Sequence, residues 1–135
     1  MANTTFFYSI LIREAHLDTF GHVNNAKYLQ IFEEARWDFI TANGYGLAEI
    51  QKCQQSPIML EVHLKWKREL RLRETIRIES SVVAYRKKIG ILRQKILNSK
   101  GELAAVADFT FGLFDTQIRK LIIPTEAWQR ALGIV

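Results

Sequence analysis

The chain has 135 residues, of which 48% are hydrophobic and 24% charged, and its formal net charge is +5, so we expect one soluble globular domain over residues 1–135. Its single cysteine, Cys53, excludes an internal disulfide bond and a multi-cysteine zinc site, which favours a reducing, cytoplasmic compartment. The sequence contains neither a secretory signal nor an apolar run of about 20 residues, so we expect no membrane partner.

The first third of the sequence predicts a strand followed by a long helix. Residues 6–13 are rich in β-branched and aromatic side chains, which is typical of a strand. Asn24 and Asn25 are suitable helix caps, because an Asn side chain accepts hydrogen bonds from the free N–H groups of a first turn. Apolar residues then continue to Ile40 around more than one stripe, which indicates a helix buried on most of its surface. Gly44 favours the left-handed conformation that ends a helix.

After Pro57 the hydrophobic pattern changes to a period of two, which is typical of strands with one buried face. We expect strands at residues 57–67, 75–85, 89–97 and 103–114, a short strand within 117–123, and a last short helix that begins at Pro124. The predicted inward-facing residues are Ile58, Leu60, Val62, Leu64 and Trp66, then Ile76, Ile78, Ser80, Val82 and Ala84, and finally Ala105, Ala107, Phe109, Phe111 and Leu113. Because the connecting turns are short, neighbouring strands are antiparallel. The sequence therefore predicts an α+β fold in which one antiparallel sheet curls around one long central helix.

Side chains suited to catalysis concentrate in the turn before the expected long helix. Asp18, His22 and Asn25 offer a carboxylate base, a switchable proton donor and hydrogen-bonding groups within eight residues. They stand where free N–H groups and the positive end of a helix dipole stabilise developing negative charge. Cleavage of an acyl bond needs these groups. The sequence contains no Gly-x-Ser-x-Gly, no phosphate-binding Gly-rich loop and no His-Glu-x-x-His, so we expect neither a metal nor a cofactor.

The motif that these residues begin consists of Asp18, His22-Val23-Asn24-Asn25, Tyr28 and Glu33-Glu34-Ala35-Arg36-Trp37. By this motif the chain resembles hotdog-fold acyl-CoA thioesterases of the 4-hydroxybenzoyl-CoA thioesterase type, and it looks closest to the long-chain acyl-CoA thioesterase III branch. The motif is also similar to one in plant acyl-carrier-protein thioesterases. The resemblance implies a hotdog fold and hydrolysis of a medium- to long-chain acyl-CoA to free acid and CoA. It also implies an active site between two subunits, so the functional unit would be a homodimer or a homotetramer built from two dimers.

The resemblance implies a role for each residue of the motif. Asp18 would activate a water molecule or attack the thioester carbonyl itself, His22 would assist the departing thiolate, and the N–H of Asn25 would help to form the oxyanion hole. Asn24 and Tyr28 would contribute to substrate binding. The residues alone leave simpler roles open, namely a turn-forming Asp, a bridging His, plain helix caps and a core Tyr.

Two glutamates, and three positions at which this chain departs from the family pattern, bear on whether these roles apply here. Some hotdog thioesterases draw their carboxylate from the helix, which makes Glu33 and Glu34 rivals of Asp18. Family members often have a Pro where this chain has Glu69, and a Gly-Asp pair where it has Arg73-Glu74, so the shape of that turn is open. The residue Phe20 replaces an Asn of the plant enzymes, which argues against transferring their full catalytic set.

The positive net charge predicts an anionic partner, either the phosphates of CoA or a nucleic acid. Arg86, Lys87 and Lys88 at an expected hairpin turn are candidates for binding the CoA phosphates, although charges at such turns also protect sheet edges from aggregation. The sequence contains no RNA-recognition motif, so we expect no nucleic-acid partner. Three other functions stay open: a non-catalytic module that binds acyl-CoA or a polyanion, an acyl-carrier-protein thioesterase, and a hotdog dehydratase, whose Pro-rich signature is absent.

Overall fold

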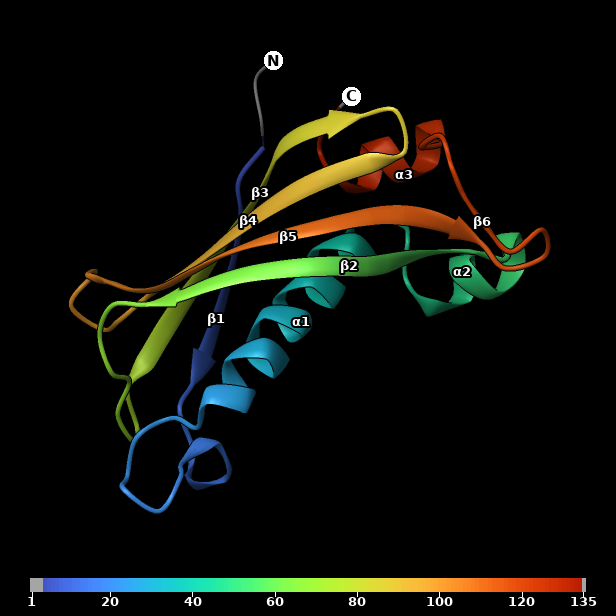
Figure 1. Ribbon diagram of the computed structural model, residues 1–135. Coiled ribbons are helices and arrows are strands. Elements are labelled where there is room, and N and C mark those ends of the chain that lie inside the picture. The colour runs from blue at the N-terminus through green and yellow to red at the C-terminus, as the bar shows by residue number, and fades with distance from the viewer. Residues whose placement is uncertain (1–3, 135) are drawn as a thin grey trace.

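The computed structural model describes residues 4–134 of the chain. One antiparallel sheet curls over a long helix, as Figure 1 shows. The strands are β1 (Phe6–Leu11), β2 (Gln55–Trp66), β3 (Thr75–Arg86), β4 (Ile89–Leu97), β5 (Leu103–Asp115) and β6 (Lys120–Ile122). The helices are α1 (Asn25–Ala42), α2 (Leu47–Cys53) and α3 (Glu126–Ala131), with a short 3-10 turn at Glu14–His16. The strand order is β1-β3-β4-β5-β2, and β6 pairs with β5. This is the predicted α+β hotdog architecture.

The core lies between the inner face of the sheet and one face of α1. The five predicted inward-facing residues of β5 are all buried, from Ala105 to Leu113. Phe32 of α1 packs edge-on against Phe109, with ring centroids 5.8 Å apart. The other buried residues of α1 are Tyr28, Ile31, Ala35, Phe39 and Ile40. The apolar pattern of these two elements therefore determines how the helix sits on the sheet.

A β-bulge in β3 corrects one predicted inward position. The pairing with β4 shifts between Val82 and Ala84, so Val83 is the extra residue. Because a shift of one residue exchanges the two faces of a strand, Ala84 is exposed although it was predicted to face inward. The next residue, Tyr85, turns inward instead and packs against Phe111, with ring centroids 5.4 Å apart.

The edge strand β2 departs most from its prediction. Four of its five predicted inward residues are exposed, to 36%, 48%, 42% and 50%: Ile58, Leu60, Val62 and Trp66. The pairing of β2 with β5 also shifts between Met59 and Glu61. The shift makes Leu60 the extra residue, so Met59 instead of Ile58 pairs with the inward-facing Phe111. Val62 and Trp66 pair with the inward-facing Phe109 and Ala105, as predicted, but β2 ends the sheet and no element within residues 4–134 covers them.

The long helix is covered on one face only, not on most of its surface as predicted. Leu29 and Trp37 of α1 are 42% and 39% exposed. Both lie on the side of α1 that faces β2, where they line the space between the two elements. The uncovered sides of α1 and β2 therefore form one apolar surface.

The predicted ends of α1 are confirmed. The side chain of Asn24 accepts from the N–H of Ala26 at 2.9 Å, and Gly44 has φ +89° just after the helix. The last helix begins later than predicted, because the hydroxyl of Thr125 caps it by accepting from the N–H of Trp128 at 3.2 Å. None of the helices in the described range is long and apolar enough to cross a membrane.

Candidate active site

The loop between β1 and α1 is closed by its own backbone hydrogen bonds. The N–H of Asp18 donates to the carbonyl of His22 at 2.8 Å, and the N–H of Gly21 donates to the carbonyl of Asp18 at 3.1 Å. Gly21 has φ +82°, a conformation that glycine adopts without steric cost. The N–H of Asn24 donates to the carbonyl of His16 at 2.9 Å, which fixes the loop at the start of α1. The sequence therefore holds Asp18 and His22 in a compact turn at the helix N-terminus.

The half-buried carboxylate of Asp18 is held by main-chain donors. Its Oδ1 accepts from the N–H of Phe20 at 2.9 Å and from the N–H of His22 at 3.3 Å. This geometry is the turn-forming role that the residues alone left open. No hydrogen bond to Oδ2 is formed by any residue in the range 4–134. The turn therefore orients the carboxylate and leaves one oxygen available for chemistry.

The N-terminus of α1 presents a backbone donor without a partner. The side chain of Asn24 caps the helix through Ala26, and the N–H of Lys27 donates to the carbonyl of Asn24 at 2.9 Å. The N–H of Asn25 donates to no acceptor in the described part of the chain. It stands at the positive end of an 18-residue helix, where a developing oxyanion is stabilised. This position suits the predicted oxyanion role of Asn25.

The structure places Glu69 against His22. Nε2 of His22 lies 2.8 Å from Oε2 of Glu69, and Oε1 of Glu69 accepts from Nη2 of Arg71 at 2.6 Å and from Nε at 3.1 Å. The Arg71 hydrogen bond, together with the charges of His22 and Arg71, lowers the pKa of Glu69. Glu69 is therefore ionised at neutral pH. The sequence showed Glu69 only as a departure from the family pattern, because its partner lies far away along the chain.

The segment 67–74, which we call the tether loop, attaches to both ends of the loop that carries Asp18. At one end, the N–H of Val23 donates to the carbonyl of Leu70 at 3.4 Å, and Leu70 is fully buried. At the other end, the N–H of Arg73 donates to the carbonyl of Ile12 at 2.8 Å, and Nη2 of Arg73 pairs with Glu14 at 2.9 Å. Arg73 adopts φ +65°, so this turn keeps a left-handed residue where the family often has Gly.

Tyr28 connects the core to this end of the molecule. It is buried and packs edge-on against Trp66, with ring centroids 6.1 Å apart. Burial raises the pKa of Tyr28, and the negative charges of Glu69 and Glu74 raise it further. Its hydroxyl therefore stays neutral at physiological pH, which suits both a core role and a place beside a bound acyl group.

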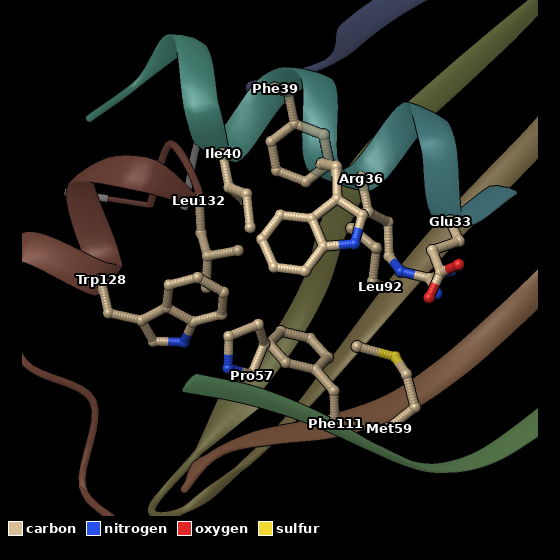
Figure 2. A pocket seen from close by; sticks show the side chains of 11 residues that line it. Glu33, Arg36, Phe39, Ile40, Pro57, Met59, Leu92, Phe111, Trp128 and Leu132 are labelled. Atoms are coloured by element: carbon tan, nitrogen blue, oxygen red, sulfur yellow. The ribbon is translucent and has the colours of Figure 1, made fainter. Parts of the chain in front are cut away.

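An apolar space runs between α1 and β2. A pocket of about 90 Å³ is lined by residues of α1, β2, β4, β5 and α3, including Ile40, Pro57 and Trp128, as Figure 2 shows. A more open groove of about 380 Å³ lies next to it and is lined by Leu29 and Val62 among others. Glu33 and Arg36 line both spaces, which are therefore two parts of one depression. We call this depression the α1–β2 groove.

A buried polar chain supports the floor of this groove, and sequence reasoning missed it. Nη1 of Arg36 donates to Oε1 of Gln94 at 3.0 Å, while Nε2 of Gln94 donates to Ser80 Oγ and to the carbonyl of Phe32, each at 3.0 Å. The Arg36 guanidinium lies over the Phe109 ring, 4.4 Å from its centroid, and burial lowers the pKa of Arg36 to about 10. Gln94 on the apolar inner face of β4 was the available signal.

The remaining predicted site residues lie elsewhere. Glu33 and Glu34, the rival carboxylates, are both exposed, and Glu34 accepts from the hydroxyl of Tyr8, which raises the pKa of Tyr8 to about 12. Arg86, Lys87 and Lys88 lie at the β3–β4 turn. This turn is at the opposite end of β3 from the loop between β1 and α1, because Leu11 pairs with Thr75 (Figure 1). At about 3.3 Å per residue, β3 separates the two ends by about 36 Å. Within a single chain this basic turn is therefore far from Asp18, and its role in binding the CoA phosphates stays a prediction.

Three comparisons identify similar proteins. Residues 12–132 match the profile of the thioesterase-like superfamily. The chain is 32% identical over 114 residues to the long-chain acyl-CoA thioesterase FadM of Escherichia coli strain K12. The aligned residues cover 84% of this chain and 86% of that protein. The probable thioesterase YbaW from Escherichia coli superposes with a TM-score of 0.83 at 28% identity, over 95% of this chain and 96% of that one.

The fold alone is shared with a more distant structure. The Staphylococcus aureus protein SAV2348, whose structure is a complex with CoA, superposes with a TM-score of 0.88 at 20% identity. The match covers 97% of this chain and 83% of the other.

Proposed function

The chain belongs to the thioesterase-like superfamily and is a thioester hydrolase, and from this premise we propose that it hydrolyses medium- to long-chain acyl-CoA to free acid and CoA. The observation that carries the proposal is the carboxylate of Asp18, which is oriented through one oxygen in the loop that leads into α1, together with the first N–H of that helix, at Asn25, which has no acceptor within residues 4–134. The name of the Escherichia coli relative, a long-chain acyl-CoA thioesterase, supports the preference for longer acyl chains.

The proposed reaction begins at the thioester carbonyl carbon. Oδ2 of Asp18 takes a proton from a water molecule, whose oxygen attacks this carbon. The carbonyl oxygen gains the negative charge and accepts a hydrogen bond from the N–H of Asn25. When the C–S bond breaks, the CoA sulfur leaves as a thiolate or takes a proton from His22. A thiol pKa near 8.5 makes this departure easy, so His22 assists a step that already has a good leaving group.

Asp18 could instead attack the carbonyl carbon itself through Oδ2, which would form an anhydride that water then opens. Single turnover in water labelled with heavy oxygen separates the two routes. If water opens the anhydride at the Asp18 carbonyl carbon, the label enters the Asp18 carboxylate, whereas a general base passes the label only to the acid product. If water opens it at the acyl carbon, Asp18 stays unlabelled, and trapping of the anhydride with hydroxylamine then identifies the nucleophilic route. Mass spectrometry of the peptide that contains Asp18 reads this result.

We propose that the acyl group lies in the α1–β2 groove. The groove begins at Leu29, one turn or about 6 Å along the axis from Asn25, and continues toward Ile40, about 22 Å from the same end. Its open part of about 380 Å³ lies within the range of small-molecule sites. A linear apolar chain whose carbonyl is held at Asn25 would run along this space.

We also propose that the active unit is a homodimer formed along the exposed side of β2, and that two dimers assemble into a tetramer. The unpaired β2 edge and the exposed apolar residues beside it support an interface with a second copy. A second copy would bring its own β3–β4 turn to the assembly. Arg86, Lys87 and Lys88 of that turn are then candidates for the CoA phosphates.

A hydrolysis screen with free thiol release as the readout tests the proposed function. We expect the highest kcat/KM with medium- and long-chain acyl-CoAs, and lower values with short-chain and aromatic ones. Binding of acyl-CoA without turnover would support a non-catalytic module instead. Hydrolysis only of thioesters on acyl-carrier protein would identify a different carrier.

Asp18→Asn tests the assignment of the carboxylate in the same screen. The variant keeps an oxygen that can accept from Phe20 and His22, so the turn persists while the charge is lost. We expect kcat to fall by roughly a hundredfold or more, with CoA affinity unchanged. Asp38→Asn, on the exposed surface of α1, is the matched control. If Asp18→Asn hydrolyses acyl-CoA at the parental rate, the assignment of Asp18 is wrong.

A further inference from the structure

We propose that Glu69 is a positioning residue for His22, an inference that rests on the proposed thioester hydrolysis. Its carboxylate, itself fixed by Arg71, holds the His22 ring through Nε2. Because Nε2 is then committed to Glu69, Nδ1 is the ring nitrogen that remains to face the substrate. The proton that the CoA sulfur acquires as the C–S bond breaks would come from this nitrogen.

The Glu69 carboxylate uses its two oxygens for two different partners. Oε1 accepts two hydrogen bonds from the Arg71 guanidinium, at 2.6 and 3.1 Å, and Oε2 lies 2.8 Å from Nε2 of His22. A carboxylate held on both sides has little freedom to rotate, so its position is transmitted to the imidazole. Glu69 therefore orients the His22 ring in the way that a buried acid orients the histidine of a catalytic triad, without touching the substrate itself.

The backbone brings these two side chains together. The N–H of Val23, which follows His22, donates to the carbonyl of Leu70, which follows Glu69. Leu70 is fully buried and Val23 nearly so, which fixes both segments relative to the core. The contact between His22 and Glu69 is therefore made by side chains that project from two adjacent, anchored positions.

The exposure of the pair argues against a role in stability. The side chains of His22 and Glu69 are 49% and 40% exposed, and ion pairs in such surroundings contribute little to the free energy of unfolding. The contact between Glu69 and His22 therefore acts on the orientation of the imidazole ring. The proposal therefore predicts a change in catalysis without a change in melting temperature.

Glu69→Gln is the test variant, and Glu102→Gln is its matched control. Glu102 is 40% exposed like Glu69, and it also pairs with an arginine of the tether loop, Arg68, at 3.4 Å. We expect Glu69→Gln to lower kcat roughly tenfold with KM unchanged. A positioned acid–base group contributes roughly 10²- to 10⁴-fold to the rate, and the variant should lose only part of the contribution of His22. Glu102→Gln should leave kcat within about twofold of the parent.

A double-mutant cycle with His22→Gln isolates the positioning role. Once the imidazole is absent, Glu69 has nothing to orient, so Glu69→Gln should cost less than about twofold in the His22→Gln background. Nitrogen-15 NMR of the parent should show a slowly exchanging proton on Nε2 of His22, and Glu69→Gln should lose this signal.

The outcomes separate this inference from the proposed function. Equal costs of Glu69→Gln in both backgrounds, or a kcat equal to that of Glu102→Gln, overturn the positioning role while the parent remains a thioesterase. A parent protein that hydrolyses no acyl-CoA overturns the proposed function, and the positioning role with it.

Discussion

Main-chain hydrogen bonds hold or supply the groups that we assign to catalysis. Asp18 is oriented by the N–H groups of Phe20 and His22, and the proposed oxyanion donor is the N–H of Asn25 rather than its side chain. A backbone donor sets no requirement on the side chain, so an ordinary alanine substitution tests it poorly. A substitution that removes the N–H itself is needed.

Asn25→Pro removes this N–H without removing the helix. Asn25 is the first helical residue, where Pro is favoured, and Asn24 has φ −63° and ψ 141°, which a residue before Pro adopts readily. We expect kcat to fall by roughly 10²- to 10³-fold, as when one oxyanion-hole donor is lost elsewhere. Asn25→Ala keeps the N–H and should retain most of the activity. Equal activities of the two variants would contradict the oxyanion role; circular dichroism checks that α1 is intact in both.

The buried Gln94 makes a separate residue-scale prediction, on stability. Gln94→Leu leaves the buried hydroxyl of Ser80 without its partner and removes the acceptor of the half-buried Arg36 guanidinium. We expect the free energy of unfolding to fall by about 1–3 kcal/mol, measured by urea denaturation. Adding Arg36→Met removes the unpaired charge as well, so the double variant should lose less than the sum of the two single losses. Strict additivity would show that the chain does not act as a unit.

At the scale of elements, most of the fold could be predicted from the sequence and most of the exceptions occur at edges. The predicted strand at residues 89–97 coincides with β4 because its apolar alternation faces a complete core. The alternation in β2 was equally clear, but Val62 and Trp66 are uncovered because no element of the described part of the chain lies beyond this edge strand. The bulge at Val83 also left no local signal, since it depends on pairing with β4.

The candidate site follows the same division. The turn and cap chemistry of Asp18 and Asn24 is local, so the sequence revealed it. The contacts of Glu69 with His22, and of Arg36 with Gln94, join segments distant in sequence, and only the fold brings them together. Glu69 stood out solely because it replaced an expected Pro.

Acid should loosen the tether loop from the loop that carries Asp18. The pKa of Glu14 is lowered by a backbone hydrogen bond and by Arg73, and that of Glu69 is lowered by Arg71 and His22. Because both carboxylates are exposed, their stabilisation of this contact is small and local. Since their pKa is lowered in the folded state, this stabilisation is present above the ordinary pKa of 4.5 and is lost as the pH falls through the lower folded value. We expect amide-exchange protection of Val23 to fall selectively below about pH 4.5.

The double variant Glu14→Gln/Glu69→Gln supplies the control for this experiment. Without the two titrating carboxylates, protection of Val23 should no longer depend on pH in this range, while protection of the core residue Ile96 should follow the parent. Unchanged protection of Val23 in the parent down to pH 3 would mean that the backbone bond to Leu70 holds the loop by itself.

For the whole molecule, the uncovered α1–β2 groove is the feature that a single chain does not explain. Leu60 and Val62 of β2 and Leu29 and Trp37 of α1 are all more than a third exposed, and they line one depression beside a strand edge that no residue in the range 4–134 pairs with. Apolar side chains gathered in this way mark interaction surfaces. A second copy packed on β2 would cover them and enclose the acyl site.

Val62→Glu should therefore separate the proposed dimer, because it places a charge in the middle of the surface that the second copy covers. Val83→Glu is the matched control: Val83 is 38% exposed against 42% for Val62, but it lies on β3, away from the groove. We expect the parent and Val83→Glu to sediment as dimers or tetramers, and Val62→Glu to sediment as a folded monomer that has lost thioesterase activity. A monomeric parent with full activity would contradict the shared site. An assembled but inactive Val62→Glu would instead show that Val62 acts on the acyl group within one chain.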